Sequence, residues 1–228
     1  MRLAKPRLDL GLFTTNESAM LQFWQDTIGL PFEETLPLGG GVRQQRHAMN
    51  GSVLKINAAR DALNPAPPTG YRRLIIARPD LPEPRDEQDP DGNTVTLVPV
   101  GHDGITGIAV ELRVRDVTAH ARFFAHAMQF EQIGPDSFRC GDSLLLLRQD
   151  PAAIRVEPLR APGYRYLTVQ VWDVASEHAG ILDRGGEEGR PPATLGSTAR
   201  VSFVRDPDGN WIEVSQRASL TGPLPDSQ

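Results

Sequence analysis

The sequence of 228 residues predicts an α+β fold assembled from tandem copies of one module, each reading as strand, helix and further strands. Two repeats support this prediction. The segment DPDGNTVTL at residues 89–97 returns as DPDGNWIEV at residues 206–214, and the stretch that begins at Leu10 is repeated about a hundred residues later from Val110. The composition agrees, because 39% hydrophobic and 23% charged residues are typical of a globular protein with a buried core.

The first module opens with a strand and a helix. Leu10, Leu12 and Thr14 alternate with the residues between them, the period of a half-buried strand. Asn16 or Ser18 can then cap the helix, whose apolar stripe is expected to pack in the core, and Gly29 is placed to end it. Short strands up to residue 57 complete the module.

The other modules vary this pattern. The third has a strand from Val110 and Asp116 as the helix cap. The fourth is expected to contain a strand from Gly163, a helix over roughly residues 175–182, a Gly/Pro-rich loop at residues 184–196 and two strands. The second is abridged, because the chain between its first strand and its DPDGN turn is too short for a helix and one further strand.

The repeated DPDGN segment is a tight-turn sequence. Proline fixes φ at its second position, and glycine accepts a conformation that other residues resist. The five shared letters therefore predict a turn. The residue three positions after the asparagine is Thr96 in one copy and Glu213 in the other, so only the second copy carries a carboxylate.

Charge and composition limit the possible partners. A formal net charge of −5 and a pI near 5.6 give no reason to expect nucleic acid or an anionic membrane surface as a partner. No apolar run approaches the roughly 20 residues of a membrane span. The N-terminal apolar run is interrupted by Asp9, so no secretory signal is expected, and the single Cys140 excludes an internal disulfide. We expect a cytoplasmic protein with a small-molecule partner, and the less enclosed second module would suit a homodimer.

A strand–helix–three-strand unit with TIGLPF after its helix and DPDGN before its last strand resembles the vicinal oxygen chelate superfamily, which includes glyoxalase I, extradiol dioxygenases and bleomycin-resistance proteins. The resemblance covers roughly residues 7–217. It implies βαβββ modules whose curved mixed sheets surround a cavity, with one domain at residues 1–101, a second at 102–217 and a flexible tail at 218–228. It also implies a divalent metal, such as Fe, Mn, Ni or Zn.

The resemblance places the possible metal ligands at the first and last strands of each module. The eight positions are Asp9, Lys55, Arg73, Thr96, Ala109, Leu145, Tyr166 and Glu213. Cations and apolar side chains do not suit a first-row divalent ion, so we expect the usual metal site to be lost. Asp9 and Glu213 could meet only if the first module pairs with the fourth, and His47 is the remaining possible ligand. The sequence leaves the pairing of modules open.

Strand parity groups the candidate ligand-binding residues, because alternate residues of a strand share one face. With Glu213 this face is expected to collect Glu111, Arg113, Tyr166, Thr168, Gln170 and Trp211. Tyr166 and Trp211 would offer a stacking surface. A Glu213 carboxylate near Glu111 would have a raised pKa and serve as general base.

Three functions are compatible with these patterns. The first is metal-independent binding of a small molecule. The second is a metal-dependent dioxygenase, or a lyase or isomerase of the glyoxalase type, using Asp9 and Glu213. The third is a structural or assembly protein with a vestigial cavity.

Overall fold

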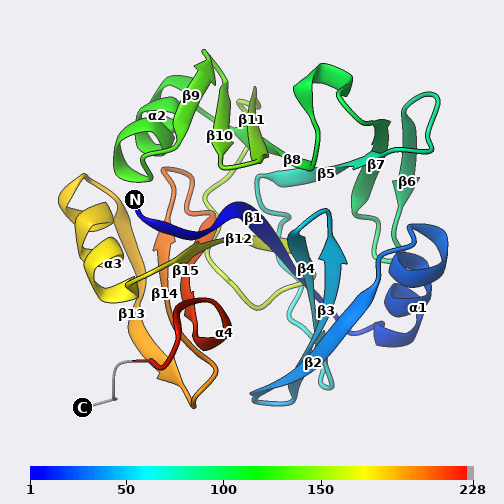
Figure 1. The fold of residues 1–228 in the computed structure, drawn as a ribbon, viewed down its shortest axis with the longest axis horizontal. Coiled ribbons are helices and arrows are strands. Elements are labelled where there is room, and N and C mark those ends of the chain that lie inside the picture. Colours follow the sequence, from blue (N-terminus) through cyan, green and yellow to red (C-terminus); the bar gives the residue numbers. More distant parts are fainter. Residues whose placement is uncertain (225–228) are drawn as a thin grey trace.

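The computed structural model describes residues 1–224 and contains two mixed β-sheets (Figure 1). The eight-stranded sheet has the order β13 (Glu187–Leu195), β14 (Ala199–Arg205), β15 (Trp211–Arg217), β12 (Gly163–Val171), β1 (Leu3–Thr14), β4 (Ser52–Ala59), β3 (Val42–Met49) and β2 (Phe32–Gly39). The seven-stranded sheet has the order β6 (Arg85–Gln88), β7 (Thr94–Pro99), β5 (Tyr71–Arg78), β8 (Ile108–Val114), β11 (Ser143–Gln149), β10 (Ser137–Cys140) and β9 (Glu131–Gly134).

Helices join the strands of three modules. The first and third modules contain α1 (Glu17–Gln22) and α2 (Val117–Arg122), each continued by a π-helical turn, η1 (Phe23–Thr27) and η3 (Phe123–Ala127). The fourth contains α3 (Val174–Asp183), and the short elements η2 (His102–Gly104) and α4 (Ala218–Thr221) follow β7 and β15. Within residues 1–224, no helix is long and apolar enough to cross a membrane.

The sheets show how the modules pair. Antiparallel pairing of β1 with β12 joins the first module to the fourth, and pairing of β5 with β8 joins the second to the third. Each sheet therefore draws strands from both halves of the chain, and residues 1–101 and 102–217 do not form separate sheets. The predicted α+β fold of tandem modules is confirmed, including the second module without a helix between β5 and β6.

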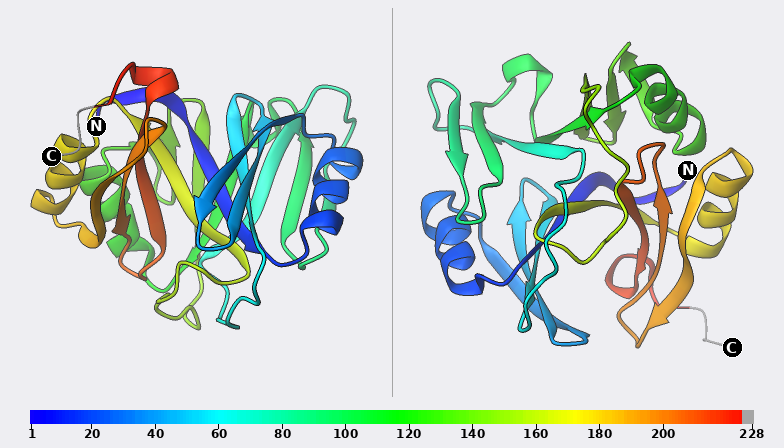
Figure 2. Two further views of the ribbon diagram at one scale, coloured as in Figure 1. Left: turned by 90° about the horizontal axis from the view of Figure 1, so that it is seen from below. Right: turned by 180° about the vertical axis from the view of Figure 1, so that it is seen from behind.

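The main core lies between the two sheets. Leu10 and Ile56 from the eight-stranded sheet belong to one buried apolar cluster with Leu74 and Val110 from the seven-stranded sheet. Buried helix residues such as Trp24 join the same cluster. Because side chains alternate along a strand, the remaining face of each sheet is turned away from this core (Figure 2). Those two faces are the candidate ligand-binding faces.

Several of the local predictions are confirmed, and two are wrong. Asp116 caps α2, with its side chain accepting from the Ala119 N–H at 3.0 Å, and Gly29 ends the first helix at a φ of +75°. Asn16 precedes α1 as predicted, but its side chain makes no capping hydrogen bond. The loop predicted at residues 184–196 is mostly the strand β13, which tolerates its prolines because it lies at the sheet edge.

The predicted tail also differs at its start. Residues 218–221 form the helix α4, in which the Thr221 hydroxyl donates to the Arg217 carbonyl at 3.2 Å. Residues 225–228 of the predicted tail lie outside the described residues.

Candidate functional site

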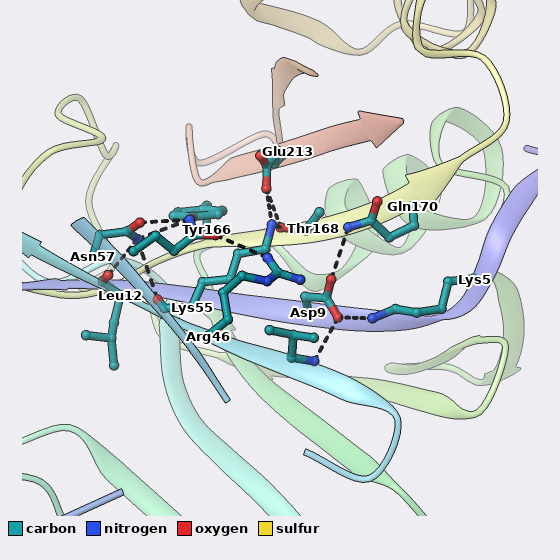
Figure 3. A network of polar contacts seen from close by, with 12 residues as sticks. Lys5, Asp9, Leu12, Arg46, Lys55, Asn57, Tyr166, Thr168, Gln170 and Glu213 are labelled. Atoms are coloured by element: carbon teal, nitrogen blue, oxygen red, sulfur yellow. Dashed lines mark hydrogen bonds and ion pairs between the residues drawn. The ribbon is translucent and has the colours of Figure 1, made fainter. Parts of the chain in front are cut away.

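Polar side chains from the central strands of the eight-stranded sheet converge on its concave face (Figure 3). In the strand register, Asp9 is opposite Thr168 and Thr168 is opposite Glu213, so these three side chains share one face. Lys55 joins them from β4, opposite Gly11. Gly11 is required here, because a Cβ at this position would lie 2.1 Å from the Tyr166 ring.

Lys55, Thr168 and Glu213 form the centre of this face. The Lys55 ammonium donates to Thr168 Oγ1 at 2.8 Å and forms an ion pair with Glu213. The Thr168 hydroxyl donates to Glu213 Oε2 at 2.6 Å. Lys55 is only 3% exposed, and this burial lowers its pKa although the charges of Glu213 and Asp9 oppose the shift. A buried ammonium with a lowered pKa beside a carboxylate has the chemistry of a proton-transfer pair.

Asp9 is fully buried and its oxygens are already bound. Oδ1 accepts from Lys5 Nζ at 2.5 Å and from the Val53 N–H at 2.8 Å, and Oδ2 accepts from Gln170 Nε2 at 3.2 Å. Gln170 therefore lies on this face as predicted, but as a partner of Asp9. These contacts give Asp9 a structural role.

Tyr166 is held as a neutral phenol. Its hydroxyl accepts from Asn57 Nδ2 at 3.1 Å and from Gln44 Nε2 at 3.4 Å. Burial raises the pKa of the Tyr166 phenol, and the charge of Glu213 raises it further. The Lys55 ammonium lies 5.5 Å from the centre of the ring.

Both ends of this concave face are covered. At one end Glu34 on β2 pairs with Arg217 on β15 at 2.8 Å and with Arg46 at 3.1 Å, which ties an edge strand across the face. At the other end the segments 60–70 and 150–162 lie side by side (Figure 2). Trp211 packs there against Val156, with the Arg205 guanidinium 4.1 Å from its ring. The stacking surface predicted at Trp211 is therefore covered by protein.

The four positions that the resemblance assigns to a metal do meet in this sheet, but their chemistry does not fit one. They comprise the Lys55 ammonium, the Tyr166 phenol and two carboxylates, Asp9 and Glu213, each already paired with a lysine. Among residues 1–224, no cluster of three or more His, Cys, Asp or Glu side chains could hold a metal ion. Divalent first-row ions need several such N, O or S donors and are repelled by a nearby ammonium.

His47 does not complete the set either. Its side chain points from β3 toward the first helix, where Nε2 lies 3.0 Å from Gln25 Nε2. His47 is fully buried, and burial lowers its pKa to about 4. The hypothesis that His47 is a metal ligand on the concave face is therefore wrong, because strand alternation turns it to the other side of the sheet.

The concave face of the seven-stranded sheet contains a pocket of about 380 Å³. Its apolar lining is Ile75, Pro84, Val98, Ile105 and Leu146. Its polar and charged lining consists of Arg73, Asp86, Thr96, His102, Asp103, Glu111 and Arg148. The volume lies within the roughly 300–1,000 Å³ of small-molecule sites, and an apolar floor with a few polar groups is their usual composition.

The charged groups of this pocket are partly paired. Arg73 Nη1 lies 3.1 Å from Thr96 Oγ1 and 3.3 Å from Asp86 Oδ1. Glu111 stands between Arg73 and Leu146 in the strand register, and its carboxylate lies 3.4 Å from Arg113 Nε. Arg73 and Glu111 thus present opposite charges beside an apolar floor.

The expected grouping of Glu111 and Arg113 with Glu213 is therefore wrong. They lie on β8 of the seven-stranded sheet, because the third module pairs with the second and not with the fourth. The residue that corresponds to Lys55 in the third module was expected to be Leu145, but it is Leu146. Leu146 is opposite Glu111, as Lys55 is opposite Gly11, whereas Leu145 faces the core. The contribution of His102 and Ile105 was not predicted, since they belong to the connection after β7.

Comparison with known proteins agrees with this architecture. The model of the Glyoxalase/Bleomycin resistance protein/Dioxygenase superfamily matches residues 107–214. The matched segment, just under half of the chain, is therefore similar to a domain of this superfamily. The matched residues cover the third and fourth modules, and the resemblance stated from the repeats is confirmed.

Solved structures extend the likeness to nearly the whole chain. Glyoxalase I from Zea mays superposes with a TM-score of 0.69 at 15% identity, over 94% of this chain and 92% of that one. A variant of glyoxalase I from Zea mays gives a TM-score of 0.72 at 15% identity, over 94% and 92% of the two chains. At these identities the likeness concerns the fold alone. No curated protein has a significantly similar sequence.

Proposed function

We propose that this protein of the glyoxalase superfamily binds a small amphipathic molecule in the pocket of the seven-stranded sheet, without a divalent metal. The observation that carries the proposal is the pocket of about 380 Å³, with an apolar floor and opposite charges at Arg73 and Glu111. An apolar body would cover Ile75 and Leu146. An acidic group of the ligand would pair with Arg73, and a hydrogen-bond donor would reach Glu111.

The donor chemistry of both faces supports binding without a metal. In the eight-stranded sheet the Lys55 ammonium already supplies a positive charge to Glu213. In the seven-stranded sheet the corresponding positions are Arg73, Thr96 and Ala109, with Leu146 opposite Glu111. A guanidinium, a hydroxyl and two apolar side chains do not form a metal site.

A second candidate function is proton transfer on the eight-stranded sheet. It is favoured by one observation, the Glu213 carboxylate held between Thr168 and Lys55 with 12% of its side chain exposed. Glu213 would accept a proton from a carbon next to a carbonyl group, and the Lys55 ammonium would stabilise the negative charge that develops on the carbonyl oxygen.

Ligand binding in the presence of a chelator tests the proposal. Amphipathic acids and amino acids are screened by ligand-observed NMR with protein in EDTA, and the dissociation constants of the hits are measured by calorimetry. Arg73→Gln and Glu111→Gln are each expected to weaken binding by about tenfold or more, the effect of losing one charged hydrogen bond. Glu131→Gln is the matched control, since Glu131 lies on β9 outside the pocket and pairs with Arg139.

Three outcomes separate the candidates. Binding that appears only after a divalent metal is added contradicts the proposal. Binding that survives both pocket variants but is lost in Glu213→Gln favours the eight-stranded sheet instead. Equal weakening in Glu131→Gln shows that the effect is not specific to the pocket.

A further inference from the structure

A second pocket, of about 190 Å³, lies where the start of β5 meets the turn before β15. It is lined by residues 67–70, Arg72, Arg113, residues 152–154, Asp208 and Asn210. We propose that this pocket binds a small anion, the carboxylate or phosphate group of a metabolite, between the guanidinium groups of Arg72 and Arg113. This site is separate from the proposed ligand pocket and from the Lys55–Glu213 face.

A β-bulge brings Arg72 to the pocket. Tyr71 is paired with Leu112 and Arg73 with Glu111, so Arg72 is the extra residue that the partner strand does not match. Bulges redirect a side chain that would otherwise follow the strand alternation.

Close contact between the two strands places Arg113 at the same pocket. Its backbone N–H donates to the Gly70 carbonyl at 2.8 Å. A Cβ at position 70 would lie 2.5 Å from the Arg113 carbonyl oxygen, so glycine permits this approach. The Gly70 N–H donates in turn to Asn210 Oδ1 at 2.7 Å, which fixes the opposite wall.

The positive charge in this pocket is only partly balanced by the protein. Arg72 makes no ion pair within residues 1–224, and its Nε is buried without a hydrogen-bond partner. Burial lowers the pKa of Arg72, and the charge of Arg113 lowers it further, while Asp150 opposes the shift. Among the described residues, the Arg113 guanidinium makes one side-chain hydrogen bond, from Nε to the Glu111 carboxylate at 3.4 Å.

The Asp208 carboxylate, which lines the pocket, is already paired with Arg115. Asp208 Oδ1 accepts from Arg115 Nε at 2.6 Å and its Oδ2 from the Arg115 N–H at 2.8 Å. Asp208 therefore does not neutralise Arg72 or Arg113. Arg72 has no carboxylate partner among the described residues, and Arg113 has only the 3.4 Å contact with Glu111. The two guanidinium groups therefore offer a planar, multidentate donor set suited to a carboxylate or phosphate.

The size of the pocket limits what can bind. A volume of about 190 Å³ is below that of typical whole-ligand sites, which begin near 300 Å³, so it accommodates an acidic group with a few attached atoms. Glu111 lines the larger pocket and Arg113 lines this one. A bound anion would compete with Glu111 for the Arg113 guanidinium.

Titration with inorganic phosphate and, separately, with acetate at low ionic strength tests this proposal. Chemical shifts of the arginine side chains report binding in the wild type, Arg72→Met, Arg113→Met and the control Arg122→Met, an exposed arginine on α2. Saturable binding of at least one anion is expected, with a loss of about tenfold or more in both pocket variants and none in the control. The preferred anion identifies the acid class.

Thermal unfolding separates a binding role from a structural one. Arg72→Met removes a half-buried charge that repels Arg113, so its Tm without anions should not fall below that of the wild type. Phosphate or acetate should raise the Tm of the wild type but not of this variant. The proposal is overturned if neither anion binds saturably, or if all three variants bind as the wild type does.

Discussion

One residue, Lys55, decides the chemistry of the eight-stranded sheet. Lys55 and Glu213 occupy corresponding places in the first and fourth modules, opposite Gly11 and Thr168 respectively. The structure thus has an ammonium where a symmetric pair of modules would present a second carboxylate. Because the Lys55 side chain is 4% exposed, its charge depends on Glu213 for compensation.

Removing the carboxylate that pairs with Lys55 should destabilise the protein. Glu213→Gln is expected to lower the free energy of unfolding by about 3 kcal/mol, because an unpaired ammonium remains buried. The double variant Lys55→Met/Glu213→Gln should recover part of this loss. Urea denaturation at pH 7 measures both, with Glu131→Gln as an exposed control; additive effects of the two substitutions would show that the pair is not coupled.

At the residue scale, counting along the repeat was enough to find Lys55, Glu213 and Tyr166, because the modules have nearly equal spacing. It was not enough for Leu146, because both preceding turns have two residues but glycine is the second residue of one, at Gly51, and the first residue of the other, at Gly141. Counting from glycine therefore selects Leu145, on the wrong face. It also could not show that Trp211 is covered, because the covering segment at 150–162 has no periodic pattern.

At the scale of elements, the two DPDGN turns have the same internal hydrogen bonds but differ in their contacts with the rest of the protein. Asp89 accepts from the Asn93 N–H at 2.8 Å, and Asp206 accepts from the Asn210 N–H at 2.8 Å, as expected of a turn motif. The second turn also packs on α2, because His120 Nε2 lies 3.4 Å from Asp206 Oδ2. The sequence predicted the turns, but their outer contacts depend on module pairing.

The contact of α2 with this turn should make stability depend on pH. Burial lowers the pKa of His120, but the Asp206 carboxylate beside the ring outweighs this effect and leaves the pKa raised. A raised folded-state pKa gives stability that is complete below about pH 6.5 and is lost as the pH rises through the folded value. His120→Gln should therefore be more destabilised, relative to wild type, at pH 6 than at pH 9. An equal deficit at both pH values in urea denaturation would exclude a charged His120.

His47, which connects β3 to the first helix, should make the stability depend on pH in the opposite direction. The pKa of His47 is lowered to about 4 by burial, so the unfolded chain binds more protons between about pH 4 and pH 6.5. Stability should fall by about 3 kcal/mol as the pH decreases through this range. His47→Gln should remove that part of the acid sensitivity, whereas exposed His126→Gln should not. Unchanged acid sensitivity in His47→Gln would contradict the lowered pKa.

At the scale of the whole molecule, module pairing determines which side chains meet. The repeat predicted the modules and the missing helix, because both are local properties of the chain. The pairing of the first module with the fourth depends on contacts between strands more than 150 residues apart, such as Leu10 with Leu167. The pairing of the second module with the third places Arg73 and Glu111 in one pocket and separates Glu111 from Glu213. Strand parity alone could not establish this.

We infer that this protein binds its ligand with charges of its own side chains in place of a divalent metal. Metal content measured by mass spectrometry, after dialysis of the protein against Mn, Fe(II), Ni or Zn and removal of free ion, tests it most directly. No stoichiometric metal is expected in the wild type, and the metal content should be the same in Glu213→Gln. One tightly bound equivalent in the wild type that is lost in Glu213→Gln would contradict it.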